Sequence, residues 1–246
     1  MRIAVFSDIH GNLPALEMVM AAIQNKNIDQ LYCLGDLVNF APWPNEVIEF
    51  IRHHQIATVC GNHDWAIGLA QSDFAFSYNS TAEKQAGLEA IAYTNEQITE
   101  NNRDYLRSMP KIVRLDFELN AGPTDILLTH GSPRSIGEYI FEDYDEAVLM
   151  KIMDEYGADL LMMGHTHRPY YRKLESVAGK LRQAINVGSV GKPKDGDPRA
   201  AYTILTMENG GLSVEQRRVT YDIERTRQAI LKSKIPDLYA DLLIKS

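Results

Sequence analysis

The sequence predicts an α/β fold, arranged as a sandwich of mixed β-sheets with helices outside. Short apolar runs alternate with longer amphipathic stretches, which is the pattern of strands followed by helices. Several runs are almost wholly apolar, as expected of strands that are covered on both faces. The runs that we interpret as strands are residues 3–6, 31–34, 56–60, 126–128, 160–163 and 184–187.

Helices are expected between these strands. Asn12 is suited to cap a helix that continues to about Gln24, and Pro14 in its first turn supports this start. Thr99 is suited to cap another helix, and Gly157 to end one. The predicted helices after the first cover residues 45–54, 80–98, 99–108 and 143–156.

The pattern changes after about residue 171. Two hairpins are predicted, one with strands 171–177 and 181–187 around Ala178–Lys180, and one with strands 201–207 and 212–219 around a turn at 208–211. Two helices, over 222–233 and 237–245, are expected to follow. Antiparallel strands after strand–helix units fit a mixed-sheet sandwich better than a simple doubly wound sheet.

Length and composition indicate one globular domain over residues 1–246, with 45% hydrophobic residues. No apolar run approaches the roughly 18–20 residues of a membrane span, and no long apolar leader precedes Asp8, so neither a membrane helix nor a signal peptide is expected. Cys33 and Cys60 lie inside apolar runs, which indicates buried thiols and favours a cytoplasmic protein.

The charge balance disfavours binding to nucleic acid. The formal net charge is -8, and the strongest basic candidate, the pair Arg217 and Arg218, is too small to follow a nucleic-acid backbone. A small anionic substrate is compatible with this charge if bound cations reverse the local field. A homo-oligomer is compatible with the sequence, which does not determine the oligomeric state.

Polar or glycine residues follow every predicted strand in this part of the chain. The six runs are followed by SDIH, GD, GNHD, THGSP, GHTH and GSVG. Ligands bind at the carboxyl ends of strands in open α/β sheets, so these residues are expected to meet in one site. Five of the seven histidines lie in these segments, whereas His53 and His54 end a predicted helix and are interpreted as solvated.

The resulting cluster has the composition of a two-metal site. Imidazole and carboxylate ligands suit manganese, iron, zinc or nickel, and seven ligands are too many for one tetrahedral zinc ion. Taken singly, Asp8 or Asp36 is also compatible with a helix cap, and Asn62 with a turn residue. The expected metal ligands are Asp8, His10, Asp36, Asn62, His130, His165 and His167.

These motifs resemble the five blocks of the calcineurin-like metallophosphoesterase superfamily. The blocks occur in order as Asp8-Ile9-His10, Gly35-Asp36, Gly61-Asn62-His63-Asp64, Thr129-His130-Gly131 and Gly164-His165-Thr166-His167. LVNFAPWPNEV, HGSPR, NVGSVGKPKDGDPRAAY and IPDLYADLL resemble its short prokaryotic single-domain branch, described as phosphodiesterases, phosphatases or diadenosine tetraphosphatase-like enzymes. The resemblance implies a four-layer α/β/β/α sandwich.

The resemblance also implies roles for the residues. One divalent ion is expected on Asp8, His10 and His167, and another on Asn62, His130 and His165, with Asp36 bridging them; Mn²⁺ is the expected metal. A hydroxide between the ions would attack phosphorus in line. His63, Asp36 and Asn62 are the expected catalytic residues, with His63 as general acid near its ordinary pKa of about 6.5.

Two positions depart from the phosphoprotein phosphatases of the superfamily. Those enzymes have Asp and then Arg where this chain has Asn39 and Phe40. This departure argues against a phosphoprotein substrate. It also removes the carboxylate that would orient His63, and Asp64 or a backbone carbonyl are the alternatives for that role. Predicted substrate contacts are Asn39, Arg134 and Arg199, with Arg168 as a further candidate.

Residues 65–109 are predicted to form a helical segment near the active site. Its aromatic residues either overhang the site and select the leaving group or only pack helices onto the sheet. They are Trp65, Phe74, Phe76 and Tyr78.

The expected function is hydrolysis of a phosphodiester or nucleotide phosphoanhydride bond in a small phosphorylated or nucleotide substrate. The alternatives are a phosphomonoesterase and a non-catalytic metal-binding scaffold, a role that this fold has in a retromer subunit. A DNA nuclease is disfavoured, since members with that role usually bring further domains and a DNA-binding surface.

Overall fold

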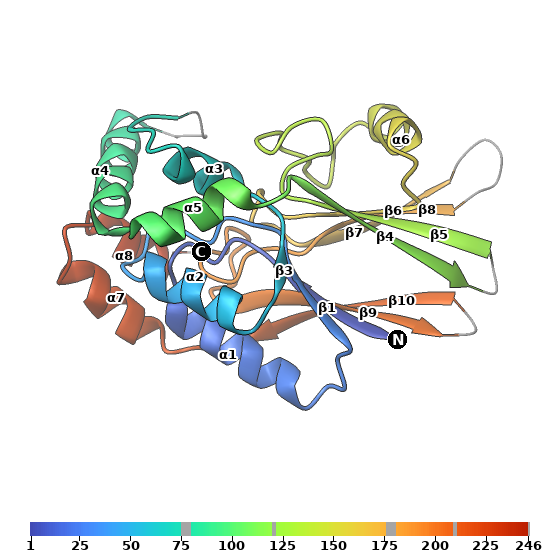
Figure 1. The fold of residues 1–246 in the computed structure, drawn as a ribbon, viewed down its shortest axis with the longest axis horizontal. Helices are drawn as coiled ribbons and strands as arrows, with labels where there is room; N and C mark the ends of the chain where they lie inside the picture. The colour runs from blue at the N-terminus through green and yellow to red at the C-terminus, as the bar shows by residue number, and fades with distance from the viewer. Residues whose placement is uncertain (75–79, 120–121, 176–180, 209–210, 246) are drawn as a thin grey trace.

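Two five-stranded mixed sheets form the centre of the molecule (Figure 1). The computed structural model describes residues 1–246 except 75–79, 120–121, 176–180, 209–210 and 246. The first sheet has the order β10-β9-β1-β2-β3 and consists of β1 (Arg2–Phe6), β2 (Gln30–Cys33), β3 (Ala57–Thr58), β9 (Ala200–Glu208) and β10 (Gly211–Val219). The second has the order β4-β5-β6-β8-β7 and consists of β4 (Ile112–Leu119), β5 (Gly122–Thr129), β6 (Leu160–Met163), β7 (Tyr170–Glu175) and β8 (Leu181–Asn186).

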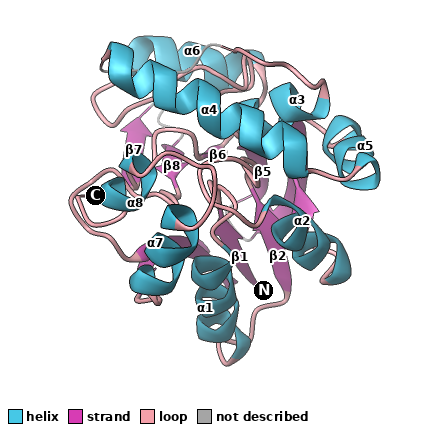
Figure 2. Ribbon diagram, turned by 90° about the vertical axis from the view of Figure 1, so that its left-hand side faces the viewer, coloured by secondary structure: helices cyan, strands magenta, loops and turns pink. Residues whose placement is uncertain are grey.

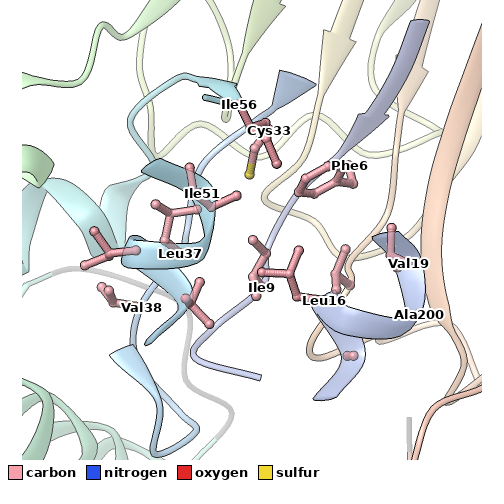
Figure 3. Packing of buried hydrophobic residues seen from close by; sticks show 14 of the residues in the cluster. Phe6, Ile9, Leu16, Val19, Cys33, Leu37, Val38, Ile51, Ile56 and Ala200 are labelled. Carbon is pink, nitrogen blue, oxygen red and sulfur yellow. The ribbon is translucent and has the colours of Figure 1, made fainter. Parts of the chain in front are cut away.

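Helices on both outer faces give the molecule four layers. The helices α1 (Leu13–Gln24) and α2 (Pro44–His53) pack on the first sheet, and α6 (Glu146–Glu155) covers the second (Figure 1). The alternation of side chains along a strand explains this arrangement. Ile3 and Val5 face the core between the sheets, whereas Phe6 belongs to the outer cluster that also contains Leu16 of α1 and Ile51 of α2 (Figure 3).

Five further helices gather at one end of the sandwich (Figures 1 and 2). They are α3 (Asn62–Gly68), α4 (Thr81–Gln97), α5 (Glu100–Ser108), α7 (Ile223–Leu231) and α8 (Leu238–Leu242). The loops that follow β1, β2, β5, β6 and β8 meet at this end and are joined to one another by backbone hydrogen bonds. Within the described ranges, no helix has the length and apolar character that crossing a membrane requires.

The predicted α/β class and the four-layer sandwich are confirmed. Asn12 caps α1 by accepting a hydrogen bond from the N–H of Ala15 at 3.3 Å, and Thr99 caps α5 in the same way. The strand expected over 56–60 is shorter, because the N–H of Cys60 donates to the carbonyl of Pro110 instead of continuing the pairing with β2. The predicted turn at 178–180 lies outside the described residues, and the turn at 208–211 lies partly outside them.

The strand β4 was not among the predicted strands. It pairs antiparallel with β5 along its whole length and extends that strand well beyond residues 126–128. Its sequence, IVRLDFEL, alternates apolar and charged residues after its first position, as an edge strand with one solvated face does. This alternating pattern differs from the continuous apolar runs that predict the buried strands before residue 171.

Replacing Leu205 by alanine tests the importance of the core between the sheets. Leu205 on β9 is fully buried there, so Leu205→Ala should lower the free energy of unfolding by about 2–5 kcal/mol in urea titrations. Leu181→Ala is the control, because Leu181 is 46% exposed and its loss should change the free energy by no more than about 0.5 kcal/mol. Equal effects of the two substitutions would contradict this description of the core.

Candidate metal centre

All seven predicted ligands lie together where the strand-ending loops meet. Asp8 and His10 follow β1, Asp36 follows β2, and Asn62 begins α3 after β3. His130 follows β5, and His165 and His167 follow β6. Asn62 is the most exposed of the seven, at 8%. The predicted convergence on one site is therefore what the structure shows.

Backbone N–H groups orient the two carboxylates. The N–H of His165 donates to Asp8 Oδ2 at 3.0 Å, and the N–H of His63 donates to Asp36 Oδ1 at 2.9 Å. Each carboxylate thus keeps its other oxygen for the imidazoles. Asp8 Oδ1 lies 3.2 Å from His167 Nε2 and 3.8 Å from His10 Nε2.

Asp36 lies between two groups of histidines. Its Oδ2 is 3.7 Å from His10 Nε2 on one side and 3.3 Å from His130 Nε2 on the other. His130 Nε2 is also 3.1 Å from Asn62 Oδ1. Three sets have ligand atoms that all lie within 4.8 Å of one another. They are Asp8 with His10 and His167, Asp36 with His130 and His165, and Asp36 with His10 and His63.

Hydrogen bonds to backbone carbonyls fix the histidine tautomers. The Nδ1 atom of His10 lies 3.1 Å from the carbonyl oxygen of Val38, and Nδ1 of His167 lies 2.5 Å from that of Lys192. Burial lowers the pKa of both imidazoles well below its ordinary value, so each carries one proton, and the carbonyl holds it on Nδ1. The Nε2 atoms of His10 and His167 are therefore both unprotonated. They lie 3.2 Å apart without a hydrogen bond between them.

This donor set fits divalent cations. Asp8 Oδ1 and His165 Nε2 are buried and have no hydrogen-bond partner among the described residues. Buried polar atoms are otherwise almost always paired. Cations between the bare nitrogens and the carboxylate oxygens would supply the missing partners, and imidazole with carboxylate and amide oxygen suits manganese, iron, zinc or nickel.

The backbone at the ligands adopts a conformation that few residues tolerate. Positive φ angles of 50–65° occur at five of the seven predicted ligands, namely Asp8, His10, Asp36, His165 and His167. Asn39 and Phe40 also have positive φ angles, of 79° and 70°. Non-glycine residues rarely adopt this region, and clusters of them occur at functional sites.

A third buried carboxylate, Asp64, joins the loops instead of contacting His63. It accepts hydrogen bonds from the N–H groups of Asp36 at 2.7 Å, Leu37 at 2.8 Å and Gly61 at 3.0 Å. These bonds tie the loop after β2 to the start of α3. Asp64 is therefore not the residue that orients His63, one of the two alternatives that the sequence left open.

Asn39 contacts His63 instead. Asn39 Nδ2 lies 2.9 Å from His63 Nδ1, and Asn39 Oδ1 accepts a hydrogen bond from the N–H of Phe40 at 3.0 Å. The second bond fixes the orientation of the amide, so that its NH₂ group donates to His63. The single proton of a neutral His63 is then on Nε2. Burial lowers the pKa of His63 to about 4, below the value of about 6.5 expected from sequence.

One imidazole, that of His130, offsets part of the charge of the two carboxylates at the centre of the cluster. Burial would lower the pKa of His130, but Asp36 and Asp8 outweigh it and raise the pKa to about 9. Burial would likewise raise the pKa of Asp36, but His130 and His63 hold it well below its ordinary range. In the absence of cations, His130 is thus the positive partner of these carboxylates.

A narrow cavity of about 20 Å³, with room for about one water-sized group, opens onto the cluster. Tyr139 stacks on His165 with ring centroids 3.9 Å apart, and Phe40 stacks on Tyr239 of α8 at 4.6 Å. Asp36, Phe40, His63, Glu83, Tyr139, His165, His167, Lys192, Lys194 and Tyr239 line the cavity. Lys192 and Lys194 are not among the site residues predicted from sequence, although GKPKDG follows a predicted strand end.

The predicted arginine contacts lie elsewhere. Arg134 pairs with Glu138 and Arg199 with Asp197, and neither arginine lines the cavity above the cluster. Arg168 lines a neighbouring cavity. A role for Arg134 or Arg199 in binding substrate remains a prediction that this placement does not favour.

The segment 65–109 does reach the cluster. Phe74 contacts the ring of His63 edge-on with centroids 5.0 Å apart, and Glu83 of α4 lines the cavity. Trp65 packs in the outer core of the first sheet, and the Lys111 ammonium lies 4.1 Å above its ring. Phe76 and Tyr78 lie outside the described residues.

Comparison with known proteins points to one family. Residues 1–210 match the model of the calcineurin-like phosphoesterase superfamily domain. The chain is 35% identical to the uncharacterized protein MJ0912 of Methanocaldococcus jannaschii, over 98% of this chain and 96% of that protein. It is 26% identical to phosphodiesterase YfcE of Escherichia coli, over 87% of this chain and 91% of YfcE.

Solved structures agree with this match. A metallophosphoesterase from Sphaerobacter thermophilus superposes with a TM-score of 0.76 at 29% identity, covering 100% of this chain and 98% of that one. The hypothetical protein PH1004 from Pyrococcus horikoshii superposes with a TM-score of 0.79 at 22% identity, covering 98% and 97%. The second similarity supports the fold alone.

Gly61→Ala should disrupt the centre without removing any ligand. A Cβ atom at Gly61 would overlap the backbone nitrogen and carboxylate of Asp36 and lie 2.8 Å from Asp36 Cγ, so Asp36 must move. We expect the bound metal, measured by mass spectrometry after dialysis against Mn²⁺, to fall about tenfold or more. Gly137→Ala is the matched control, since its Cβ would meet no atom within 4 Å. Unchanged metal content in Gly61→Ala would contradict the geometry of Asp36.

Proposed function

Because the chain belongs to the calcineurin-like phosphoesterase superfamily, we propose that it is a metal-dependent hydrolase of phosphodiester or nucleotide phosphoanhydride bonds. The observation that supports the proposal best is the meeting of imidazole nitrogens and carboxylate oxygens at buried strand ends, with Asp8 Oδ1 and His165 Nε2 left without a hydrogen-bond partner among the described residues. The similarity to YfcE, a relative named as a phosphodiesterase, supports diesters over monoesters as the proposed substrates of this chain.

Two divalent cations are proposed, in the sets expected from sequence. Asp8, His10 and His167 would hold one, and Asn62, His130 and His165 the other, with Asp36 between them. Once bound, such cations supply a water molecule of lowered pKa and neutralise charge on phosphoryl oxygens. Mn²⁺ is the proposed metal, and iron, zinc and nickel suit the same donors.

His63 is the proposed proton donor to the leaving oxygen. Its ring lines the cavity, and its Nε2 lies 4.0 Å from Asp36 Oδ2, which places it beside the proposed bridging ligand. The amide of Asn39 at Nδ1 leaves the proton on Nε2, on the side of Asp36. An anionic phosphoryl group in contact would favour a positive His63 and thereby raise its pKa from the low value that burial causes.

The surroundings of the site argue against large substrates such as phosphoproteins. The cavity is narrow, and Tyr139, Tyr239 and Glu83 line it from three different segments. Phe40 stands where phosphoprotein phosphatases of the superfamily have arginine, so the chain lacks that phosphate contact in the loop after β2. A small phosphorylated or nucleotide substrate fits these walls better.

Metal removal and restoration test the proposed activity. Protein stripped with a chelator should lose hydrolysis of bis(p-nitrophenyl) phosphate, regain it with Mn²⁺ and bind about two ions per chain. Turnover of p-nitrophenyl phosphate in parallel separates the diesterase from the alternative of a phosphomonoesterase. Two bound ions without turnover of either compound would favour a nucleotide phosphoanhydride substrate or a non-catalytic scaffold, and absence of bound metal would refute the centre itself.

Substrates with different leaving groups distinguish a proton-donating role of His63 from an orienting role. His63→Ala should lower kcat about 10²–10⁴-fold for diesters with an alkyl alcohol as leaving group, and less for p-nitrophenol, which leaves without a proton. His53→Ala is the control, because His53 is exposed at the end of α2. Equal losses for both leaving groups would assign His63 to orienting the substrate instead of protonating it.

A further inference from the structure

A second cavity, of about 230 Å³, lies beside the one that opens onto the metal cluster. Glu83, Lys192 and Lys194 line both cavities, so the two adjoin. The second cavity is lined by four cationic side chains and one acidic one: Arg168, Lys192, Lys194, Lys245 and Glu83, together with Pro193 and Leu242. Its charge is thus positive, in a chain whose formal net charge is -8.

The cationic residues are tied to the loops that carry the proposed metal ligands. The N–H of Lys192 donates to Ser189 Oγ at 2.8 Å, and Ser189 Oγ donates to the carbonyl of Asp8 at 2.8 Å. The N–H of Lys194 donates to the carbonyl of His167 at 3.3 Å. Arg168 Nε donates to the carbonyl of Lys194 at 3.0 Å. The backbone beneath these cations therefore has a fixed position relative to the metal cluster.

Lys192 is an uncommon buried cation. Lys192 is 8% exposed. Its Nζ lies 4.2 Å from the ring centroid of Phe40 and 5.0 Å from that of Tyr239. Glu83 is the single acidic residue among the described residues that line this cavity, against four cationic ones. Aromatic faces offset only part of the cost of burying an ammonium group, and an anion would offset the rest.

We propose that this cavity binds a second, non-reacting phosphate of the substrate, so that the substrate carries at least two phosphate groups. The inference rests on the proposed function, since it places the reacting phosphate at the metal cluster. Lysine and arginine are the side chains that bind phosphate oxygens, and charge-assisted hydrogen bonds to them are the strong ones. A second phosphate next to the reacting one would enter the adjoining cavity and become the partner of Lys192 and Lys194.

Competitive inhibition of bis(p-nitrophenyl) phosphate hydrolysis tests the proposal. The probes are adenosine monophosphate and the α,β-methylene analogue of adenosine diphosphate, which differ by one phosphate, at a fixed concentration of free Mn²⁺. The diphosphate analogue should inhibit at least about tenfold more strongly than the monophosphate. In the double variant Lys194→Ala/Lys245→Ala, both of whose residues are exposed, the ratio of the two inhibition constants should fall about tenfold or more.

Lys151→Ala is the matched control, because Lys151 is an exposed lysine of α6, on the outer face of the second sheet, and its loss should leave the ratio of inhibition constants unchanged. Equal inhibition by the two probes, or a ratio that survives in the double variant, would overturn the second phosphate site while the proposed activity stands.

Calorimetric titration with the same two probes keeps the inference separate from catalysis. If the protein hydrolyses no phosphoester but binds the diphosphate analogue more tightly than the monophosphate, and loses this preference in the double variant, the cavity is supported and the proposed activity is not. If neither probe binds in either cavity, the second phosphate site is refuted whatever the activity.

Discussion

Two negative charges buried at the meeting of the loops impose the main constraint on this structure. Asp8 and Asp36 are excluded from water, and each has one oxygen held by a backbone N–H group. Isolated buried carboxylates are very costly, so positive partners are required. Only His130 among the adjacent imidazoles has a raised pKa, whereas burial keeps His10 and His167 neutral. The arrangement is thus completed best by cations that come from outside the chain.

Most of the metal-ligand cluster could be predicted from the sequence, because the ligands lie just after predicted strands. Asp8, Asp36, His130 and His165 each follow an apolar run directly, so their convergence follows from the topology of parallel strands. The contact of Asn39 with His63 and the placement of Glu83 beside Lys192 were not accessible. These depend on how α3 and α4 pack over the loops, and no local periodicity encodes such long-range packing.

The position of positive charge distinguishes this site from that of the phosphoprotein phosphatases. Where those enzymes have arginine, Phe40 offers an aromatic face, and the ammonium of Lys192 lies above it. The loop after β8 thus places an ammonium group next to the cluster. This segment also donates hydrogen bonds to the carbonyls of Asp8 and His167, so it is joined to the loops of the metal cluster.

The left-handed backbone at the ligands has a consequence for how such centres arise. Apart from glycine, the residues that tolerate positive φ best are asparagine, aspartate and histidine, and these are also oxygen and nitrogen donors for metals. Asp8, His10, Asp36, Asn39, His165 and His167 belong to this small group, and Phe40 is the exception among the strained residues of the site. A sharp turn at the end of a strand is therefore compatible with several of the residue types that coordination chemistry needs, because short polar side chains can hydrogen-bond locally in this conformation.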